Sequence, residues 1–242
     1  MNDILKSLHN RKSIRVFEDR GIPSSIKREI LLAAMAAPSA GNQQLYTILD
    51  ITDQAIKDRL AITCDNQPFI AKAPMVLIFL ADCQKWYDAY EAFSCEPRLP
   101  GVGDLLLAVS DCTIAAQNAV TAAESFGIGS CYIGDIMERC EEHRELLSLP
   151  PYVFPAAMLV FGYPTAQQKA RKKPERCELA DIVHENAYRR IDPSVFPEML
   201  KRHSGTQEFG VWLNVFCTRK YNSDFAKEMT RSVAEYLKQF QT

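Results

Sequence analysis

A run of apolar residues without alternation constrains the fold of this chain more than any other feature. The segment "MVLIFLA" at 75–81 is apolar at every position. A strand with one solvated face alternates apolar and polar residues, so an unbroken apolar run predicts a central strand covered on both faces. The run is also far shorter than the roughly 20 residues that a membrane span requires.

Helices and further strands surround this run in the sequence. The segment "PSSIKREILLAAMAAP" at 23–38 predicts a helix that Pro38 ends. The Ala-rich segment 104–127 predicts a long helix, closed by Gly127, in the core or in a subunit interface. Further strands are expected at 46–51, 130–136 and 156–162, and further helices at 52–62, with Thr52 as N-cap, and at 222–240. The pattern predicts one continuous α/β or α+β domain.

The overall charge and the cysteines narrow the class of protein. The net charge of the 242-residue chain is −2, so no global basic field indicates a nucleic-acid or membrane partner. The N-terminus carries Asp3 and lacks the apolar core of a signal peptide. The 8 cysteines form no C-x-x-C pair and are typical of reduced thiols in a cytoplasmic protein.

Several catalytic motifs are absent from the sequence. It contains no H-E-x-x-H, no paired cysteine knuckle, no G-x-S-x-G and no G-K-[ST], so we expect neither a metal site nor a serine nucleophile. "GVGDLL" and "GIGSCY" begin like dinucleotide fingerprints, but Leu106 and Tyr132 stand where the last glycine is required. If the chain binds a phosphorylated cofactor, side chains must supply the donors.

The segment "RKSIR" at 11–15 supplies such donors. Arg11, Ser13 and Arg15 occupy alternate positions, so an extended chain presents all three on one face. Arg11 and Arg15 are then ~13 Å apart, at about 3.3 Å per residue, which suits two parts of one elongated ligand. The alternative is a solvated edge strand with surface ion pairs.

A second basic cluster lies late in the chain. The segment "RKKPER" at 171–176 places four cations in six residues, and folding can bring them beside Arg11. The alternative is a solvated basic loop. The surrounding stretch, 164–222, is polar and weakly periodic, and we expect it to form an arm that packs on a partner subunit.

Five segments in this order carry a family resemblance: "RKSIR", "AAPSAGNQQ", "NQPFIAKAP", "GIGSCYIGDI" and "KKPERCELADIVHENAYRR". Together they resemble the nitroreductase family of FMN flavoproteins, and more narrowly its oxygen-insensitive branch that favours NADPH. The resemblance implies an α+β, nitroreductase-like fold, with a central, mostly antiparallel sheet surrounded by helices, in a domain-entwined homodimer. It also implies an FMN-binding domain at 1–190 and a C-terminal extension and helix at 191–242 that pack on the same domain or on the partner subunit.

The resemblance assigns residues to the cofactor. Arg11 and Ser13 would hold the FMN phosphate or ribityl end, and Arg15 would lie near N1 and the C2 carbonyl, where a cation stabilises the reduced form. The backbone N–H of Gly134 would point at N5. The full cofactor-binding set is Arg11, Lys12, Ser13, Arg15, Pro38, Ser39, Asn42, Gln67, Tyr132, Ile133, Gly134, Asp135, Lys173 and Arg176, with Pro38, Ser39 and Asn42 coming from the second subunit.

Lys173 and Arg176 would complete the clamp on the phosphate. The extra residue Glu175 interrupts the commoner K-P-R pattern, so whether Lys172 or Lys173 contacts the phosphate stays open. Lys201 and Arg202 are further candidates for the NADPH 2′-phosphate.

The implied chemistry needs no catalytic side chain, because the cofactor carries it. NADPH or NADH would deliver hydride to the flavin and leave, and a nitroaromatic, quinone, azo compound or free flavin would then take the electrons in a ping-pong reaction. Trp86, Tyr87, Tyr90 and Phe93 would form an aromatic wall over the pocket for these small-molecule acceptors or, equally, pack against the partner.

Two other functions stay open. The same fold and cofactor would serve a different reaction in a relative that removes halogen, dehydrogenates rings or fragments the flavin. Alternatively, the basic clusters would grip a phosphate ligand in a non-enzymatic binding domain.

Overall fold

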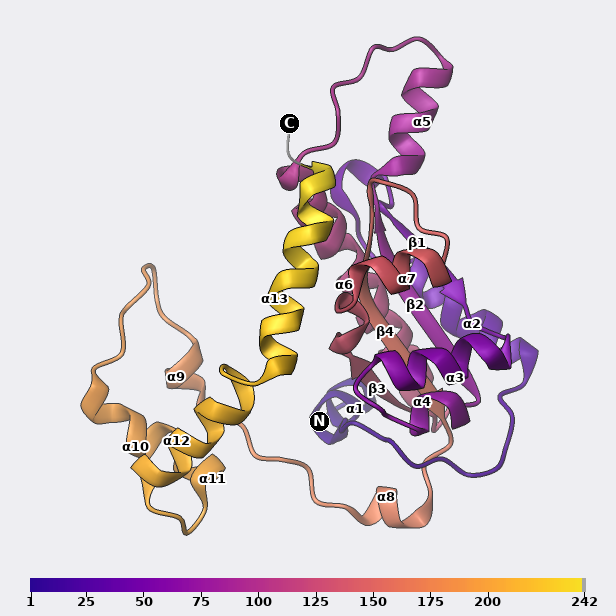
Figure 1. Ribbon diagram of the computed structural model, residues 1–242. Coiled ribbons are helices and arrows are strands. Elements are labelled where there is room, and N and C mark those ends of the chain that lie inside the picture. Colours follow the sequence, from indigo (N-terminus) through magenta and orange to yellow (C-terminus); the bar gives the residue numbers. More distant parts are fainter. Residues whose placement is uncertain (241–242) are drawn as a thin grey trace. The chain divides into compact units, whose positions relative to one another are not determined.

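The computed structural model describes residues 1–240, and a four-stranded antiparallel sheet organises its core (Figure 1). The strands β1 (Tyr46–Asp50), β2 (Met75–Asp82), β3 (Gly129–Ile133) and β4 (Val153–Gly162) follow the order β1-β2-β4-β3. All three strand pairs are antiparallel. Every residue of β2 is buried at an inner position, which confirms the central strand predicted from the apolar run.

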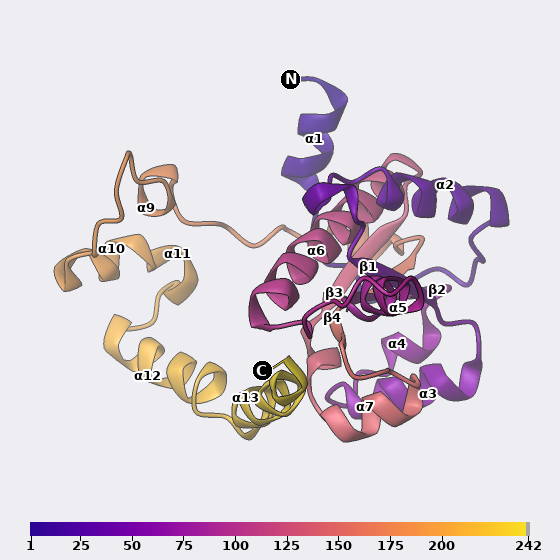
Figure 2. The ribbon, with the colours of Figure 1, turned by 90° about the horizontal axis from the view of Figure 1, so that it is seen from above.

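Helices cover both faces of this sheet. Leu77 and Phe79 of β2 pack in one core with α2 (Ser24–Met35) and α6 (Val102–Ser125). Val76 and Ile78 point the other way, into a second core. The second core also contains α3 (Gln54–Thr63), α4 (Phe69–Lys72) and the short 3-10 helix η2 (Gly134–Met137). From above, α2 and α6 lie side by side (Figure 2).

Helix α6 is the predicted long apolar helix. Among the described residues it alone is long and apolar enough to cross a membrane by length and composition, and 44% of its most apolar window is buried inside the protein. It contacts all four strands, as the core helix of a globular protein does. Gly127 follows it with φ +71, the left-handed conformation that favours glycine after a helix, as predicted.

Several predicted boundaries were wrong: β4 begins at Val153 and not at 156, and α2 ends at Met35, three residues before Pro38. Two further errors have a clear local cause. The N-cap of α3 is Asp53 and not Thr52, because the Asp53 carboxylate accepts a 3.0 Å hydrogen bond from the Ile56 N–H. Strand β3 ends at Ile133, before residue 136, because the chain turns into η2 at Gly134. The remaining elements are α1 (Asp3–Asn10), η1 (Ala40–Asn42), α5 (Gln84–Ala92), α7 (Cys140–Leu146), α8 (Ala166–Ala170), α9 (Leu179–Ile182), η3 (Pro193–Val195), α10 (Phe196–Met199), α11 (Lys201–Ser204), α12 (Phe209–Lys220), α13 (Asp224–Leu237) and η4 (Lys238–Phe240).

The chain forms two compact units. The first contains Met1–Arg171 together with the chain from Glu228 onward, and it includes the sheet. The second, Lys172–Lys227, contains the short helices α9–α12 and leaves apolar side chains such as Leu179 and Tyr188 exposed. The predicted boundary at residue 190, between an FMN-binding domain and a C-terminal extension, stays a prediction.

The segment 11–17 runs beside the sheet at the edge strand β3. The Ile14 N–H donates to the Ser130 carbonyl at 2.9 Å, and the Ile14 side chain is buried. A Cβ on Gly129 would collide with the side chain of Ile14, so glycine permits this close approach. The glycine and the backbone hydrogen bond fix the polar segment 11–15 along β3.

Candidate functional site

The two arginines of the segment 11–15 lie over different aromatic rings. The Arg11 guanidinium is 5.7 Å from the ring centroid of Tyr132 in β3, and the Arg15 guanidinium is 5.9 Å from that of Phe69 in α4. Cations at such distances are attracted to the ring face. Burial raises the pKa of Tyr132 to about 12 even though Arg11 opposes the shift, so the phenol stays neutral. The two arginines therefore lie at two different places beside the sheet, one over Tyr132 and the other over Phe69.

The surroundings of Arg11 suit an anion. Its buried Nε atom has no hydrogen-bond partner among the described residues. The Lys12 ammonium donates to the Lys169 carbonyl at 2.7 Å and to the Arg171 carbonyl, and the Arg171 guanidinium donates to the Ser13 carbonyl. Four cations thus gather along this segment. Arg171 was not among the predicted residues, although it begins the basic cluster.

One carboxylate faces these cations. Burial raises the pKa of Glu124 near the end of α6, and the charges of Arg11 and Lys12 lower it. The cations of this segment outnumber Glu124, so the segment remains suited to a phosphate group.

Gln67 and the turn after β3 form the second part of the site. The Gln67 side-chain amide donates to the Asp135 carboxylate at 2.7 Å and to the Cys64 carbonyl at 2.9 Å. The side chain of Ile133 is buried, so only its backbone is available to a ligand. Gln67 precedes Phe69, the residue under Arg15, by two positions. The structure thus brings together the segments 11–15, 67–69 and 132–135.

Gly134 begins η2 at the surface of this site. A Cβ placed on it would meet nothing nearer than Met137 Cε at 4.0 Å. The fold itself therefore does not require glycine at this position. A ligand that approaches the backbone closely would require it.

Glu138 follows this turn and was missed by sequence reasoning. Its side chain is buried, and its Oε1 atom has no hydrogen-bond partner among the described residues. Burial raises the pKa of Glu138 to about 7, with further contributions from Asp135, Asp65 and Glu228, while Arg139 lowers it. No motif marks an acid of this kind, because its properties come from residues distant in sequence.

The predicted residues Pro38, Ser39 and Asn42 lie in another part of the first unit. Ser39 accepts a 3.0 Å hydrogen bond from the Gln44 N–H, and Asn42 has φ +56, the left-handed region. The buried Asp111 carboxylate of α6 accepts from the Ala40 N–H at 2.9 Å and from the Leu45 N–H at 3.3 Å. These contacts involve no residue of the segments 11–15, 67–69 and 132–135.

Asp111 was also missed by sequence reasoning, which considered Gln117 and Asn118 on the same helix. Asn118 donates to the Ala33 carbonyl at 3.2 Å, and Gln117 accepts from the Tyr132 hydroxyl at 3.5 Å, so both serve internal packing. The available signal was an acid between the apolar residues Val109 and Cys112 of a core helix.

Lys173 and Arg176 belong to the second unit, where their predicted role stays a prediction. Lys172 forms an ion pair with Glu175 at 3.0 Å. Arg202 pairs with Glu178 and donates to the Arg176 carbonyl at 3.3 Å. The Arg202 side chain is thus engaged by residues of its own unit.

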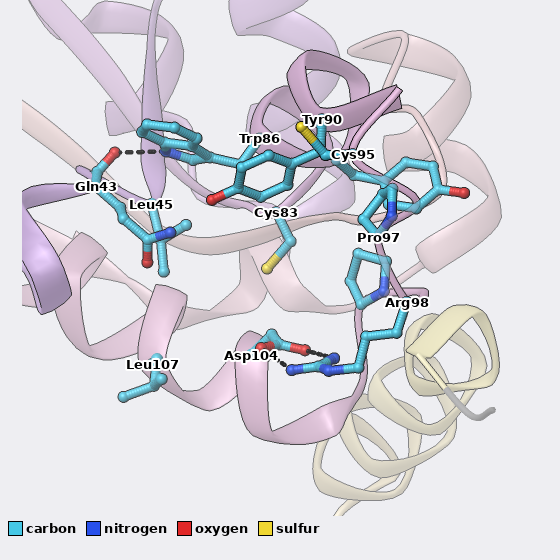
Figure 3. Close-up of a pocket in the computed structure, with 12 residues that line it drawn as sticks. Gln43, Leu45, Cys83, Trp86, Tyr90, Cys95, Pro97, Arg98, Asp104 and Leu107 are labelled. Carbon is cyan, nitrogen blue, oxygen red and sulfur yellow. Dashed lines mark hydrogen bonds and ion pairs between the residues drawn. The ribbon is translucent and has the colours of Figure 1, made fainter. Parts of the chain in front are cut away.

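A cavity of about 420 Å³ opens beside α5 (Figure 3). Trp86, Tyr87 and Tyr90 line it, together with Gln43 and Leu45 at the start of β1. The predicted fourth member of the aromatic wall, Phe93, does not line it and is 83% exposed. Helix α5 ends at Ala92, so Phe93 lies beyond the helical face that forms the wall, and for this residue the other expectation, packing against a partner subunit, stays a prediction.

These observations define a class: an α+β protein with an antiparallel sheet, whose edge carries a cluster of cationic side chains. A family model described as "Nitroreductase family" matches residues 8–163. The FMN reductase (NAD(P)H) of Bacillus subtilis is 30% identical over 98% of this chain and 91% of its own length. The oxygen-insensitive NADPH nitroreductase of Salmonella typhimurium is 34% identical over 79% of this chain and 77% of its own.

A solved structure agrees with these sequence matches. The structure of NfrA2 from B. megaterium has a TM-score of 0.83 with 28% identity, and the similarity covers 98% of both chains. The chain belongs to the nitroreductase family and has the nitroreductase fold.

Proposed function

We propose that this protein is an FMN-dependent oxidoreductase that uses NADPH or NADH to reduce nitroaromatics, quinones or related small acceptors. Its relatives include an FMN reductase and a nitroreductase. The observation that carries the proposal is the convergence of the segments 11–15, 67–69 and 132–135 on one edge of the sheet. There the buried Arg11 Nε has no hydrogen-bond partner within residues 1–240.

The residues present fit FMN. Arg11, Lys12 and Ser13, with Arg171 beside them, supply the charged and polar donors that a phosphate monoester requires. Arg15 and Gln67 would hold the flavin ring, and the open backbone at Gly134 would allow its close approach. Tyr132, Ile133 and Asp135 would line the same edge. Lys173 and Arg176 would add to the grip on the phosphate.

FMN held by these residues would supply the two-electron transfer from the nicotinamide to the acceptor. The chain would bind and orient the cofactor, and the charge of Arg15 would favour its reduced form. Because no side chain acts as a nucleophile, a broad range of acceptors follows from the chemistry of the cofactor.

We propose that the working form is a homodimer. Helix α1 packs on α6, and both leave leucines exposed: Leu5 and Leu8 on α1 and Leu106 on α6, the last 62% exposed. Exposed apolar residues on helices that pack together are typical of subunit interfaces. In such a dimer Pro38, Ser39 and Asn42 would cover the flavin of the other subunit. The cysteines of the described residues are free thiols, which supports a location in the reducing cytoplasm.

The test is an anaerobic reduction of the purified protein. We expect a yellow protein that bleaches with NADPH or NADH and regains its colour when 4-nitrobenzamide or a quinone is added under argon. A colourless protein that does not bind added FMN would overturn the proposal and favour a phosphate-ligand binding domain. Bleaching without recovery by any acceptor of these classes would favour another flavin reaction.

A further inference from the structure

We propose that the cavity beside α5 binds the acceptor, and that it selects neutral aromatic compounds over anionic ones. This inference rests on the proposed function, because it names the substrate class and the binding place for the second half of that reaction. The cavity shares no lining residue with the segments 11–15, 67–69 and 132–135.

Three aromatic rings form one wall of the cavity. Trp86 and Tyr90 lie on the same face of α5, with ring centroids 5.7 Å apart and an interplanar angle of 37°. The Trp86 indole N–H donates to the Gln43 carbonyl at 2.8 Å, which fixes the indole (Figure 3). Held rings of this kind favour a planar aromatic ligand through stacked or edge-on contacts.

The rest of the lining is mostly apolar and uncharged. Leu45 and Leu107 contribute aliphatic surface. The Cys83 thiol is also part of the lining, and burial raises its pKa to about 12, so it stays neutral. The volume of about 420 Å³ lies within the range of small-molecule sites and accommodates a substituted benzene ring.

The charges at the cavity disfavour an anion. Arg98 is the one cation among the described residues that line it, and its guanidinium donates to both oxygens of Asp104, at 2.6 and 2.9 Å. A third bond goes to the Leu99 carbonyl at 3.1 Å. Since Arg98 is already neutralised, neither a nucleotide phosphate nor a substrate carboxylate finds a free cation among the described residues of the lining.

The cavity is continuous with the loop that we assign to the flavin. Gln43, which holds Trp86, directly follows Asn42 in the chain. Asp111 accepts hydrogen bonds from Ala40 on one side of this loop and from Leu45 in the cavity wall on the other. Hydrogen bonds to Asp111 therefore connect the cavity wall to this loop. An acceptor in the cavity would thus lie beside the flavin that the loop covers.

Direct binding is measured on the oxidised holoenzyme without NAD(P)H, so that nothing turns over. The chain has 2 tryptophans, and a Trp212→Phe variant leaves Trp86 as the single reporter. We expect saturable quenching of Trp86 by 4-nitrobenzamide and at least roughly tenfold weaker binding of 4-nitrobenzoate, because the carboxylate has no free cation to meet.

Variants of α5 connect this binding to turnover. Tyr90→Ala should raise both the Kd and the KM for 4-nitrobenzamide about fivefold by removing one ring of the wall, and Tyr90→Phe should keep both near the wild-type values. Phe93→Ala is the matched control, since it removes an exposed ring outside the cavity, and it should change neither.

The outcomes separate the two proposals. A Tyr90→Ala enzyme with unchanged KM, or tighter binding of 4-nitrobenzoate than of 4-nitrobenzamide, would overturn the cavity assignment while NAD(P)H still bleaches the flavin. A wild-type protein that binds no FMN would instead overturn the proposed function.

Discussion

Replacing Asp111 by Asn should destabilise the protein by about 2 kcal/mol. The Asp111 side chain is only 3% exposed and accepts two backbone N–H groups, those of Ala40 and Leu45. An amide retains one accepting oxygen and turns an NH₂ group toward the other N–H donor. Losing one hydrogen bond to a charged acceptor costs about 1.5 to 3 kcal/mol. Burying an amide in place of a charge offsets part of the loss.

Urea unfolding at fixed protein concentration measures this effect. With a slope of about 3 kcal/mol per molar urea, 2 kcal/mol shifts the midpoint by about 0.7 M. Ser110→Ala is the matched control, because this neighbouring residue is exposed and its hydroxyl donates to the Leu106 carbonyl of its own helix. If the midpoint of Asp111→Asn matches that of Ser110→Ala, the carboxylate does not hold the loop and this reasoning fails.

Three further variants test other parts of the site. Because the pKa of Glu138 is raised to about 7, its contribution to stability is full below pH ~4.5 and lost as the pH rises through 7. The free energy of unfolding of Glu138→Gln, relative to the wild type, should therefore rise by up to about 3 kcal/mol between pH 4.5 and pH 8, as measured by urea unfolding. An equal difference at both pH values would contradict this. Gly129→Ala should cost about 2 kcal/mol in the same assay, because the added methyl collides with Ile14, and an unchanged midpoint would show that segment 11–17 is not tightly held. Arg15→Gln should lower the two-electron midpoint potential of bound FMN by about 20 to 40 mV, or about 1 to 2 kcal/mol, whereas a potential equal to that of the exposed control Arg28→Gln would remove Arg15 from the flavin.

The sequence predicted the elements whose residues carry one unambiguous pattern. The unbroken apolar run placed β2 at the centre of the sheet, and the Ala-rich segment gave α6 as a core helix. The limits of β3 were less predictable, because Gly134 ends the strand through a local turn that periodicity does not reveal. Local geometry decided this boundary.

The site was predictable where a motif carried it and not where packing made it. Alternation predicted two separated cations at Arg11 and Arg15, and the structure places them over different rings, those of Tyr132 and Phe69. Asp111 and Glu138 were missed, because each owes its importance to backbone or acidic groups that only the folded chain brings near. Phe93 could not be separated from the other three aromatics in advance, since residue type alone does not show where a helix ends.

The affinity for FMN compared with riboflavin tests the central claim most directly, because the two ligands differ only in the phosphate. We expect the wild type to bind FMN at least roughly a hundredfold more tightly, as two charge-assisted hydrogen bonds of about 1.5 to 3 kcal/mol each imply. Arg11→Gln should weaken FMN binding and leave riboflavin binding unchanged. Equal affinities for the two flavins in the wild type, or an equal loss of both in Arg11→Gln, would contradict a phosphate site at Arg11.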